Sequence, residues 1–208
     1  MLKVALRLFS LSIILFLFSC ATVPVELPVY EGVNIQDDLS SRNRISAIDG
    51  IFSIVFEKED TEMRGDGMMH LVRNGDLNLR LYSLGFLALE LTSEKGVIRS
   101  NPKIDRGRGA ILTSGLRDCF FWWDMENYDI DEKEDVYLIS NQTRMVWVDK
   151  KTILPKKQII ILEDGREISI YYESFEKVNN VFFPAMIRIE LAKYSVTLKL
   201  KEISFTSV

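Results

Sequence analysis

Apolar residues recur at every second position along much of the chain from Gly50 onward. Four runs show this alternation most clearly, at residues 77–81, 87–91, 187–191 and 196–200. In a strand, this spacing places apolar side chains on one face and polar side chains on the other. The pattern therefore predicts strands that are buried on one face only.

Two dipeptides predict tight turns between neighbouring strands. Asn74-Gly75 lies before the run that begins at Leu77, and Asp164-Gly165 lies between two further apolar segments. Both are typical of two-residue hairpins, because a type I′ turn needs positive φ at both central residues. The turn and alternation signals together predict about ten strands in a mainly β fold, arranged as a single curved antiparallel sheet.

Two short segments have helical signals instead. Asn34 can cap a helix that runs toward Arg44, with Ile35 and Leu39 on one face. A second helical interruption is predicted between residues 110 and 123. A sheet this large, with one apolar concave face and few helices to cover it, implies a cavity.

The composition bounds the class of protein and gives little support for catalysis. The 208 residues carry a formal net charge of −4, one histidine and two cysteines. This length favours one domain, and the mild acidity argues against sequence-independent nucleic-acid binding. His70 lies among apolar residues of a predicted strand, where a structural role is expected rather than membership of a Ser-His-Asp triad. We therefore expect neither enzymatic activity nor a cofactor.

Three further features have structural interpretations. The glycine-containing segments 65–67 and 107–109 lack the following helix and Lys-Ser/Thr pair of a phosphate-binding loop, so both are interpreted as turns. The acidic run at residues 124–135 lacks the glycine and glutamate spacing of an EF-hand, so a solvated loop is predicted rather than a metal site. Cys119, next to two phenylalanines, is expected to be a small buried hydrophobe.

The N-terminal residues have the pattern of a secretion signal. Lys3 and Arg7 precede an apolar run at residues 8–18. As a helix, this run would rise only ~16 Å, against ~30 Å for the hydrocarbon core of a bilayer. It leads to Ser19-Cys20-Ala21, which resembles the bacterial lipobox, in which the cysteine is acylated before cleavage.

The resulting domain organisation has three parts. Residues 1–19 are predicted to be a signal peptide, residues 20–33 a lipidated tether, and residues 34–208 the folded domain. The acyl chains on Cys20 would bind membrane lipid. Ala21, in place of an aspartate, implies the periplasmic face of the outer membrane. The alternative is ordinary signal cleavage in which Cys20 takes no part.

Two apolar clusters each have two interpretations. Leu84 and Phe86 lie between two predicted strands, where a turn would leave them exposed at its tip. Pattern alone instead favours Leu84 folding back into the core. The aromatic cluster at residues 120–123 could close one end of a cavity, although the pattern favours a place in the core.

Several of these features resemble the LolA/LolB family of periplasmic lipoprotein carriers and outer-membrane receptors, and most closely its LolB branch. Ser83-Leu84-Gly85 and the alternating run after it are similar to the Pro-Leu-Gly loop and next strand of that branch, with Ser83 in place of proline. Leu116-Arg117 followed by Trp122 is similar to the helix that covers the cavity of the family. The segment at 183–201 is similar to its closing hairpin.

The resemblance implies a lidded half-barrel whose apolar cavity takes acyl chains. Leu84 and Phe86 would form a membrane-contact loop. The implied acyl-binding residues, whose orientation depends on strand register, are Leu77, Leu79, Leu81, Leu87, Leu89, Leu91 and, at the lid, Trp122. The implied partners are lipoprotein acyl chains and a periplasmic LolA-like carrier.

The resulting functional hypothesis is an outer-membrane lipoprotein that accepts other lipoproteins and inserts them into the membrane. One alternative is an envelope assembly or scaffold lipoprotein that uses the same fold to hold a protein partner. Another is a hydrolase of envelope glycans or lipids, since a chain with 30 acidic residues does not exclude paired carboxylates. The longer acidic segment at 124–135 also leaves room for a different amphiphilic cargo.

Overall fold

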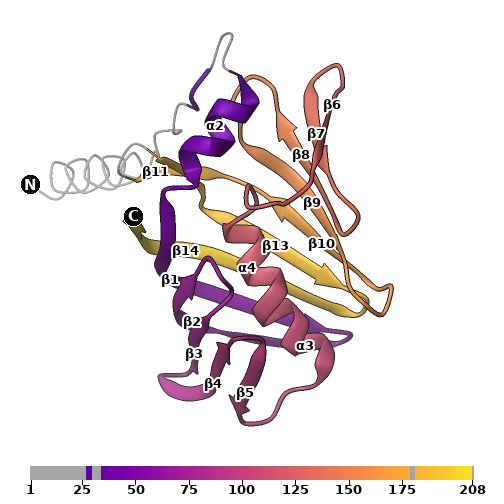
Figure 1. Ribbon diagram of the computed structural model, residues 1–208. Coiled ribbons are helices and arrows are strands. Elements are labelled where there is room, and N and C mark those ends of the chain that lie inside the picture. The colour runs from indigo at the N-terminus through magenta and orange to yellow at the C-terminus, as the bar shows by residue number, and fades with distance from the viewer. Residues whose placement is uncertain (1–26, 30–33, 179–180, 208) are drawn as a thin grey trace, which may run out of the picture.

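The computed structural model describes residues 27–29, 34–178 and 181–207 of the chain (Figure 1). The expected signal peptide, the acylated Cys20 and most of the expected tether lie outside these residues. Within the described part of the chain, no helix combines the length and the apolar character that crossing a membrane requires.

The main body is a 12-stranded antiparallel sheet that curves around a helical segment (Figure 1). The strands of its first half are β1 (Ile45–Lys58), β2 (Thr61–Val72), β3 (Leu77–Ser83), β4 (Phe86–Glu94) and β5 (Val97–Asn101). Those of its second half are β6 (Asp129–Glu132), β7 (Val136–Ser140), β8 (Arg144–Asp149), β9 (Pro155–Ile161), β10 (Glu167–Tyr172), β13 (Met186–Leu191) and β14 (Tyr194–Ser207). A separate hairpin joins β11 (Phe175–Val178) and β12 (Val181–Pro184).

The order across the sheet is β5-β4-β3-β2-β1-β14-β13-β10-β9-β8-β7-β6. The long strands β1 and β14 therefore pair in the middle, and β5 and β6 are the two free edges of an unclosed half-barrel. The predicted fold class is correct, but the predicted number of strands was too low. Both edge strands are almost entirely exposed and lack one-sided burial, so alternation could not reveal them.

Two helical regions accompany the sheet in the part of the chain that the structure describes, as predicted. The helix α2 (Ile35–Arg42) begins at Asn34, whose side chain accepts a hydrogen bond from the Gln36 amide. The second region is one continuous helical segment, built from α3 (Arg106–Ala110), the π-helical turn η1 (Ile111–Gly115) and α4 (Leu116–Phe120). It lies across the concave face of the sheet (Figure 1). We call it the helical segment below.

The two predicted hairpins are present, but their turns differ from the prediction. In each, the hydrogen bonds enclose a three-residue loop, at residues 73–75 and 163–165, and only Gly75 and Gly165 have positive φ. Three-residue loops of this kind end in a residue with left-handed backbone, for which glycine is best suited. Two-residue turns with positive φ at both positions occur instead at Leu84-Gly85 and Lys95-Gly96.

The core fills the concave face of the sheet. Phe52, Leu79 and Ile189 of three different strands are fully buried, together with Ile111 and Phe120 of the helical segment. The helical segment and the sheet therefore share one hydrophobic core, which is the condition for a stable two-layer domain.

The two glycine-containing segments interpreted as turns lie within regular elements, so that interpretation was wrong. Gly65 and Gly67 lie inside β2, and segment 107–109 lies inside α3. A Cβ on Gly67 would lie 2.3 Å from the ring of Phe52, and one on Gly65 would lie 2.1 Å from the Tyr82 carbonyl oxygen. These glycines mark close packing inside a strand rather than a change of chain direction.

Candidate functional site

The turn between β3 and β4 carries an apolar tip. Leu84 is 94% exposed and Phe86 is 78% exposed, and Leu84 has a φ of 50° beside Gly85 at 82°. Because both central residues of this turn are left-handed, the Leu84 side chain is held away from the sheet. The interpretation that Leu84 folds back into the core was therefore wrong, and the alternative of an exposed tip is correct.

A β-bulge next to this tip decides which leucines face the core. Leu81 pairs with Leu89, whereas the neighbouring Tyr82 pairs with Leu87, so Ala88 is an extra residue in β4. An inserted residue reverses the face on which the following side chains point. Leu87 is consequently 53% exposed and extends the apolar tip, whereas the sequence pattern grouped it with the core.

The other implied acyl-binding leucines share the concave face. Leu77, Leu79, Leu81, Leu89 and Leu91 are all buried and belong to the hydrophobic core cluster. Leu87 does not share their face. Five of the six leucines implied to line the acyl-binding wall therefore lie together, on the side of the sheet that the helical segment covers.

Trp122 lies just beyond α4 and is also part of the core. Its ring is buried, and the guanidinium of Arg42 lies 5.1 Å from the ring centroid. Trp123 packs against it edge to face, with ring centroids 5.7 Å apart. The end of the helical segment is therefore anchored by aromatic packing, and of the two interpretations of this cluster the core placement is correct.

A buried polar cluster behind this end was not predicted from the sequence. Arg144 of β8 is only 6% exposed, and its guanidinium donates to the main-chain carbonyls of Trp122 and Asp124, at 3.2 and 2.8 Å. Nη1 of Arg144 also lies 3.4 Å from the Asp118 carboxylate. Burial lowers the pKa of Arg144, because desolvation disfavours the charged form, while Asp118 acts in the opposite direction.

Two neighbouring groups complete this cluster. The Tyr172 hydroxyl and the Gln158 amide are hydrogen-bonded at 2.9 Å, and burial raises the pKa of Tyr172 well above its usual range. Cys119 is fully buried as expected, and burial likewise raises the pKa of its thiol. One feature of the sequence could have predicted this cluster. Arg144 and Gln158 occupy the same alternating positions as the buried apolar residues of β8 and β9, so their side chains point into the core.

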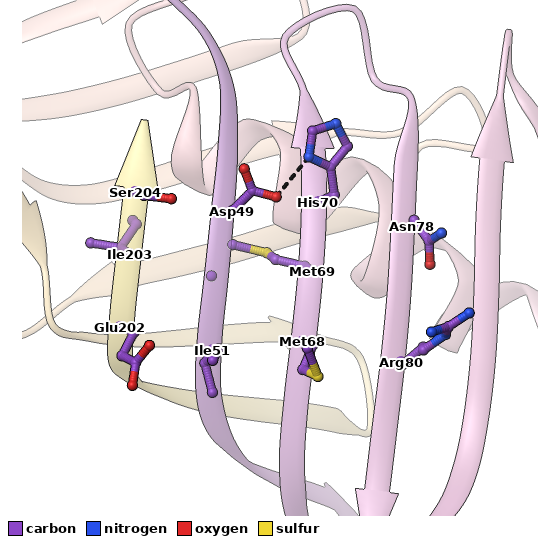
Figure 2. A pocket seen from close by; sticks show the side chains of 11 residues that line it. Asp49, Ile51, Met68, Met69, His70, Asn78, Arg80, Glu202, Ile203 and Ser204 are labelled. Atoms are coloured by element: carbon purple, nitrogen blue, oxygen red, sulfur yellow. Dashed lines mark hydrogen bonds and ion pairs between the residues drawn. The ribbon is translucent and has the colours of Figure 1, made fainter. Parts of the chain in front are cut away.

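The convex face of the sheet carries a shallow pocket of about 420 Å³ (Figure 2). His70 points outward there from β2, and its Nδ1 lies 2.7 Å from the Asp49 carboxylate of β1. Both side chains are about half exposed, and Met68 lines the same pocket. His70 is thus in a strand as predicted, but it lies on the outer surface, away from the core.

The acidic run is in part the solvated loop that was predicted, since residues 126, 127 and 133–135 are exposed and lie outside helices and strands, but it also contains a strand and ion pairs. Asp124 forms ion pairs with Arg73 and Arg117, and residues 129–132 form the edge strand β6. Within the described part of the chain, no three His, Cys, Asp or Glu side chains are grouped so that they could hold a metal ion. The run therefore contributes an acidic sheet edge and part of the contacts that hold the end of the helical segment.

The chain resembles known proteins in its fold and not in its sequence. The sequence matches no family model and no curated protein. The structure is similar to that of a LolA superfamily protein from Nitrosomonas europaea, with a TM-score of 0.56 and 13% identity over 85% of this chain and 96% of the other. It is equally similar to a DUF1329 family protein from Desulfovibrio piger, with a TM-score of 0.56 and 11% identity over 86% of this chain and 94% of the other. The chain therefore has a LolA-like fold.

Proposed function

We propose that this chain is a LolB-like receptor at the periplasmic face of the outer membrane, anchored by acylated Cys20. It would accept lipoproteins from a LolA-like carrier, bind their acyl chains and insert them into the membrane without covalent chemistry. The observation that carries this proposal is the fully exposed leucine at the tip of the β3–β4 turn. The LolA-like fold supports it independently.

The apolar tip has the properties of a membrane-contact element. Neighbouring exposed apolar side chains are uncommon on soluble proteins. Where they occur, they mark a surface that contacts a membrane or a protein partner. Leu84 is the first residue of a two-residue turn, and Phe86, the first residue of β4, follows that turn directly; both side chains are exposed. Burying both side chains in a bilayer would contribute roughly 3–6 kcal/mol, at about 1.5–3 kcal/mol for each.

The acyl-binding surface in this proposal is the leucine wall under the helical segment. Burying ~10 methylenes would supply ~8 kcal/mol, minus the cost of immobilising the chain. Because the wall leucines belong to one core with the helical segment, acyl chains could reach them only if that segment moves. Binding would therefore be coupled to displacement of α3, η1 and α4.

Lipoprotein transfer from a LolA-like carrier to outer-membrane vesicles tests the proposal. Leu84→Glu should reduce transfer at least tenfold, because a carboxylate at the tip opposes insertion, whereas Leu84→Met should retain it. Lys95→Glu is a matched control, because Lys95-Gly96 is also a turn with positive φ at both positions and lies at the opposite end of β4. Normal transfer by Leu84→Glu would refute the proposal.

A second candidate is an envelope scaffold that holds a protein partner. The observation in its favour is that the concave face is filled by the chain's own helical segment. Mass spectrometry of an organic extract of the purified protein separates the two functions. Acyl-chain ligands support the receptor, whereas a stoichiometric protein partner without lipid supports the scaffold.

A further inference from the structure

A groove of about 680 Å³ lies along the edge strand β5. One wall is β5 with the connection at residues 102–105, and the other is the start of the helical segment. Its apolar lining comes from Ile98, Ile104 and Ala110. This volume falls within the usual range of small-ligand sites, about 300–1,000 Å³.

The charged lining of the groove is basic, although the chain as a whole is acidic. Its lining contains three basic side chains and one carboxylate, which belong to Arg99, Lys103, Arg106 and Asp105. That carboxylate is already engaged, since it accepts hydrogen bonds from the Arg108 amide at 3.0 Å and from the Tyr194 hydroxyl.

Two cations of the groove differ in their pairing from the cations around it. The nearby Arg108 and Lys193 form ion pairs with Asp105 and Glu59. Lys103 and Arg106 form no ion pair with any residue that the structure describes. The two side chains are exposed, so they are available to an anion that enters the groove.

The position of the groove relates it to the apolar tip. β5 pairs antiparallel with β4, and its last residue, Asn101, lies opposite Glu90. The direction of β5 is therefore from the end of β4 at Glu94 toward its other end at Phe86, which follows the tip. Figure 1 shows the β3–β4 turn and the exit of β5 at the same end of the sheet.

We propose that this groove binds a single anionic phospholipid. One acyl chain would lie along Ile98, Ile104 and Ala110, and Lys103 and Arg106 would contact the phosphate. Two features of the groove support this ligand. Its basic side chains can form charge-assisted hydrogen bonds to a phosphate, and its apolar lining can contact an acyl chain. The biological setting, a protein held at a membrane, rests on the proposed function.

Short-chain phospholipids below their micelle concentration test this site without a membrane. The full chain with Cys20→Ser, which removes the acylation site, is titrated with dihexanoylphosphatidylglycerol and with dihexanoylphosphatidylcholine. We expect tighter binding of the anionic lipid, and weakening of that binding as salt rises. Lys103→Glu/Arg106→Glu should weaken it at least ~10-fold.

The matched control is Lys151→Glu/Lys177→Glu, which makes the same charge change at two exposed lysines outside the groove. An equal loss in this control, or no loss in the groove variant, would overturn the proposal. Equal affinity for inorganic phosphate alone would show a phosphate site without an acyl subsite, and would also overturn it. Displacement of the lipid by an acidic peptide at equal affinity would assign the groove to a protein ligand instead.

A second variant tests the acyl subsite. Ser114 is exposed at the groove, so Ser114→Trp should obstruct it and weaken both lipids, with the circular dichroism spectrum unchanged. Unchanged affinity would contradict the placement of the chain. Leu84→Glu should leave short-chain lipid binding intact, because the probe is monomeric. Loss of lipoprotein transfer in Leu84→Glu therefore tests the proposed function, whereas loss of probe binding in the groove variants tests this inference.

Discussion

Nη1 of Arg144 donates a 2.8 Å hydrogen bond to the main-chain carbonyl of Asp124. The bond joins β8 to the chain just beyond the helical segment. The Asp124 carboxylate in turn pairs with Arg73, in the β2–β3 turn, and with Arg117 of α4. One short stretch of chain is therefore held from both halves of the sheet, which fixes one end of the helical segment over the core.

This arrangement predicts that Arg144→Met destabilises the protein by about 2–4 kcal/mol, because the main-chain carbonyls of Trp122 and Asp124 lose the donor that Arg144 supplies and Asp118 keeps only its ion pair with Arg117. Arg144→Lys should recover only part of the loss, since an ammonium cannot reproduce the guanidinium fork. Urea denaturation followed by tryptophan fluorescence measures both. Equal stability of Arg144→Met and the unmodified chain would show that these contacts contribute nothing.

The glycines inside regular elements predict opposite effects of the same substitution. Gly67→Ala should cost about 2–4 kcal/mol, because its Cβ would meet the buried ring of Phe52 at 2.3 Å. Gly109→Ala is the control: a Cβ at that helical position meets nothing within 4 Å, so the change should stabilise the protein by up to about 1 kcal/mol. Thermal unfolding compares the two, and a stabilising Gly67→Ala would contradict the packing.

The left-handed Leu84 predicts a conflict between stability and function. A non-glycine residue in this conformation costs roughly 1–2 kcal/mol, and asparagine tolerates it better. Leu84→Asn should therefore raise the free energy of unfolding by about 0.5–1 kcal/mol while reducing lipoprotein transfer. If Leu84→Asn instead destabilises the protein, the leucine side chain has packing contacts and is not a free tip.

Acidification should destabilise the protein in part through Asp149. Partial burial acts to raise the pKa of this carboxyl, but hydrogen bonds from Lys156 and Thr152 lower it overall. A carboxyl whose folded-state pKa lies below its unfolded value of about 3.9 stabilises the fold above that pH, and this contribution is lost as the pH falls through the folded pKa.

Asp149→Asn should therefore cost about 1 kcal/mol at pH 7, and the difference from the unmodified chain should shrink as the pH falls below the unfolded value of about 3.9 and through the lower folded-state pKa. Unfolding curves in urea at several pH values measure this. Glu163→Gln, at an exposed position in the β9–β10 turn, is the control for the change in charge. A cost of Asp149→Asn that stays constant down to pH 2 would contradict the linkage.

Local pattern was sufficient for most of the fold. The alternation at residues 77–81 and 187–191 predicted strands with one buried face, and both runs have that burial. Asn34 was predicted to cap a helix, and its side chain does so. These features could be predicted because the strand period and the helix cap depend on residues close together in the sequence.

Part of the candidate site depends on contacts that a local pattern does not contain. Leu87 continues the alternation of residues 89 and 91, yet the bulge opposite Leu81 and Tyr82 turns it outward. The resemblance to a known family pointed to Leu84 as an exposed tip, whereas alternation alone favoured the core. The backbone of the turn decides between them, because both of its central residues are left-handed.

By itself, the sequence determined that this protein is a mainly β domain with one apolar face, hairpins at its glycine turns and a short capped helix. The tertiary structure decided which strands are edges, which leucines leave the core, and that Gly67 permits close packing against Phe52. It also decided that Lys103 and Arg106, which pair with no acidic residue in the described part of the chain, lie beside the apolar residues of one groove. The physical reason is that periodicity acts between residues two or four apart, whereas bulges, edges and grooves arise where segments distant in sequence meet.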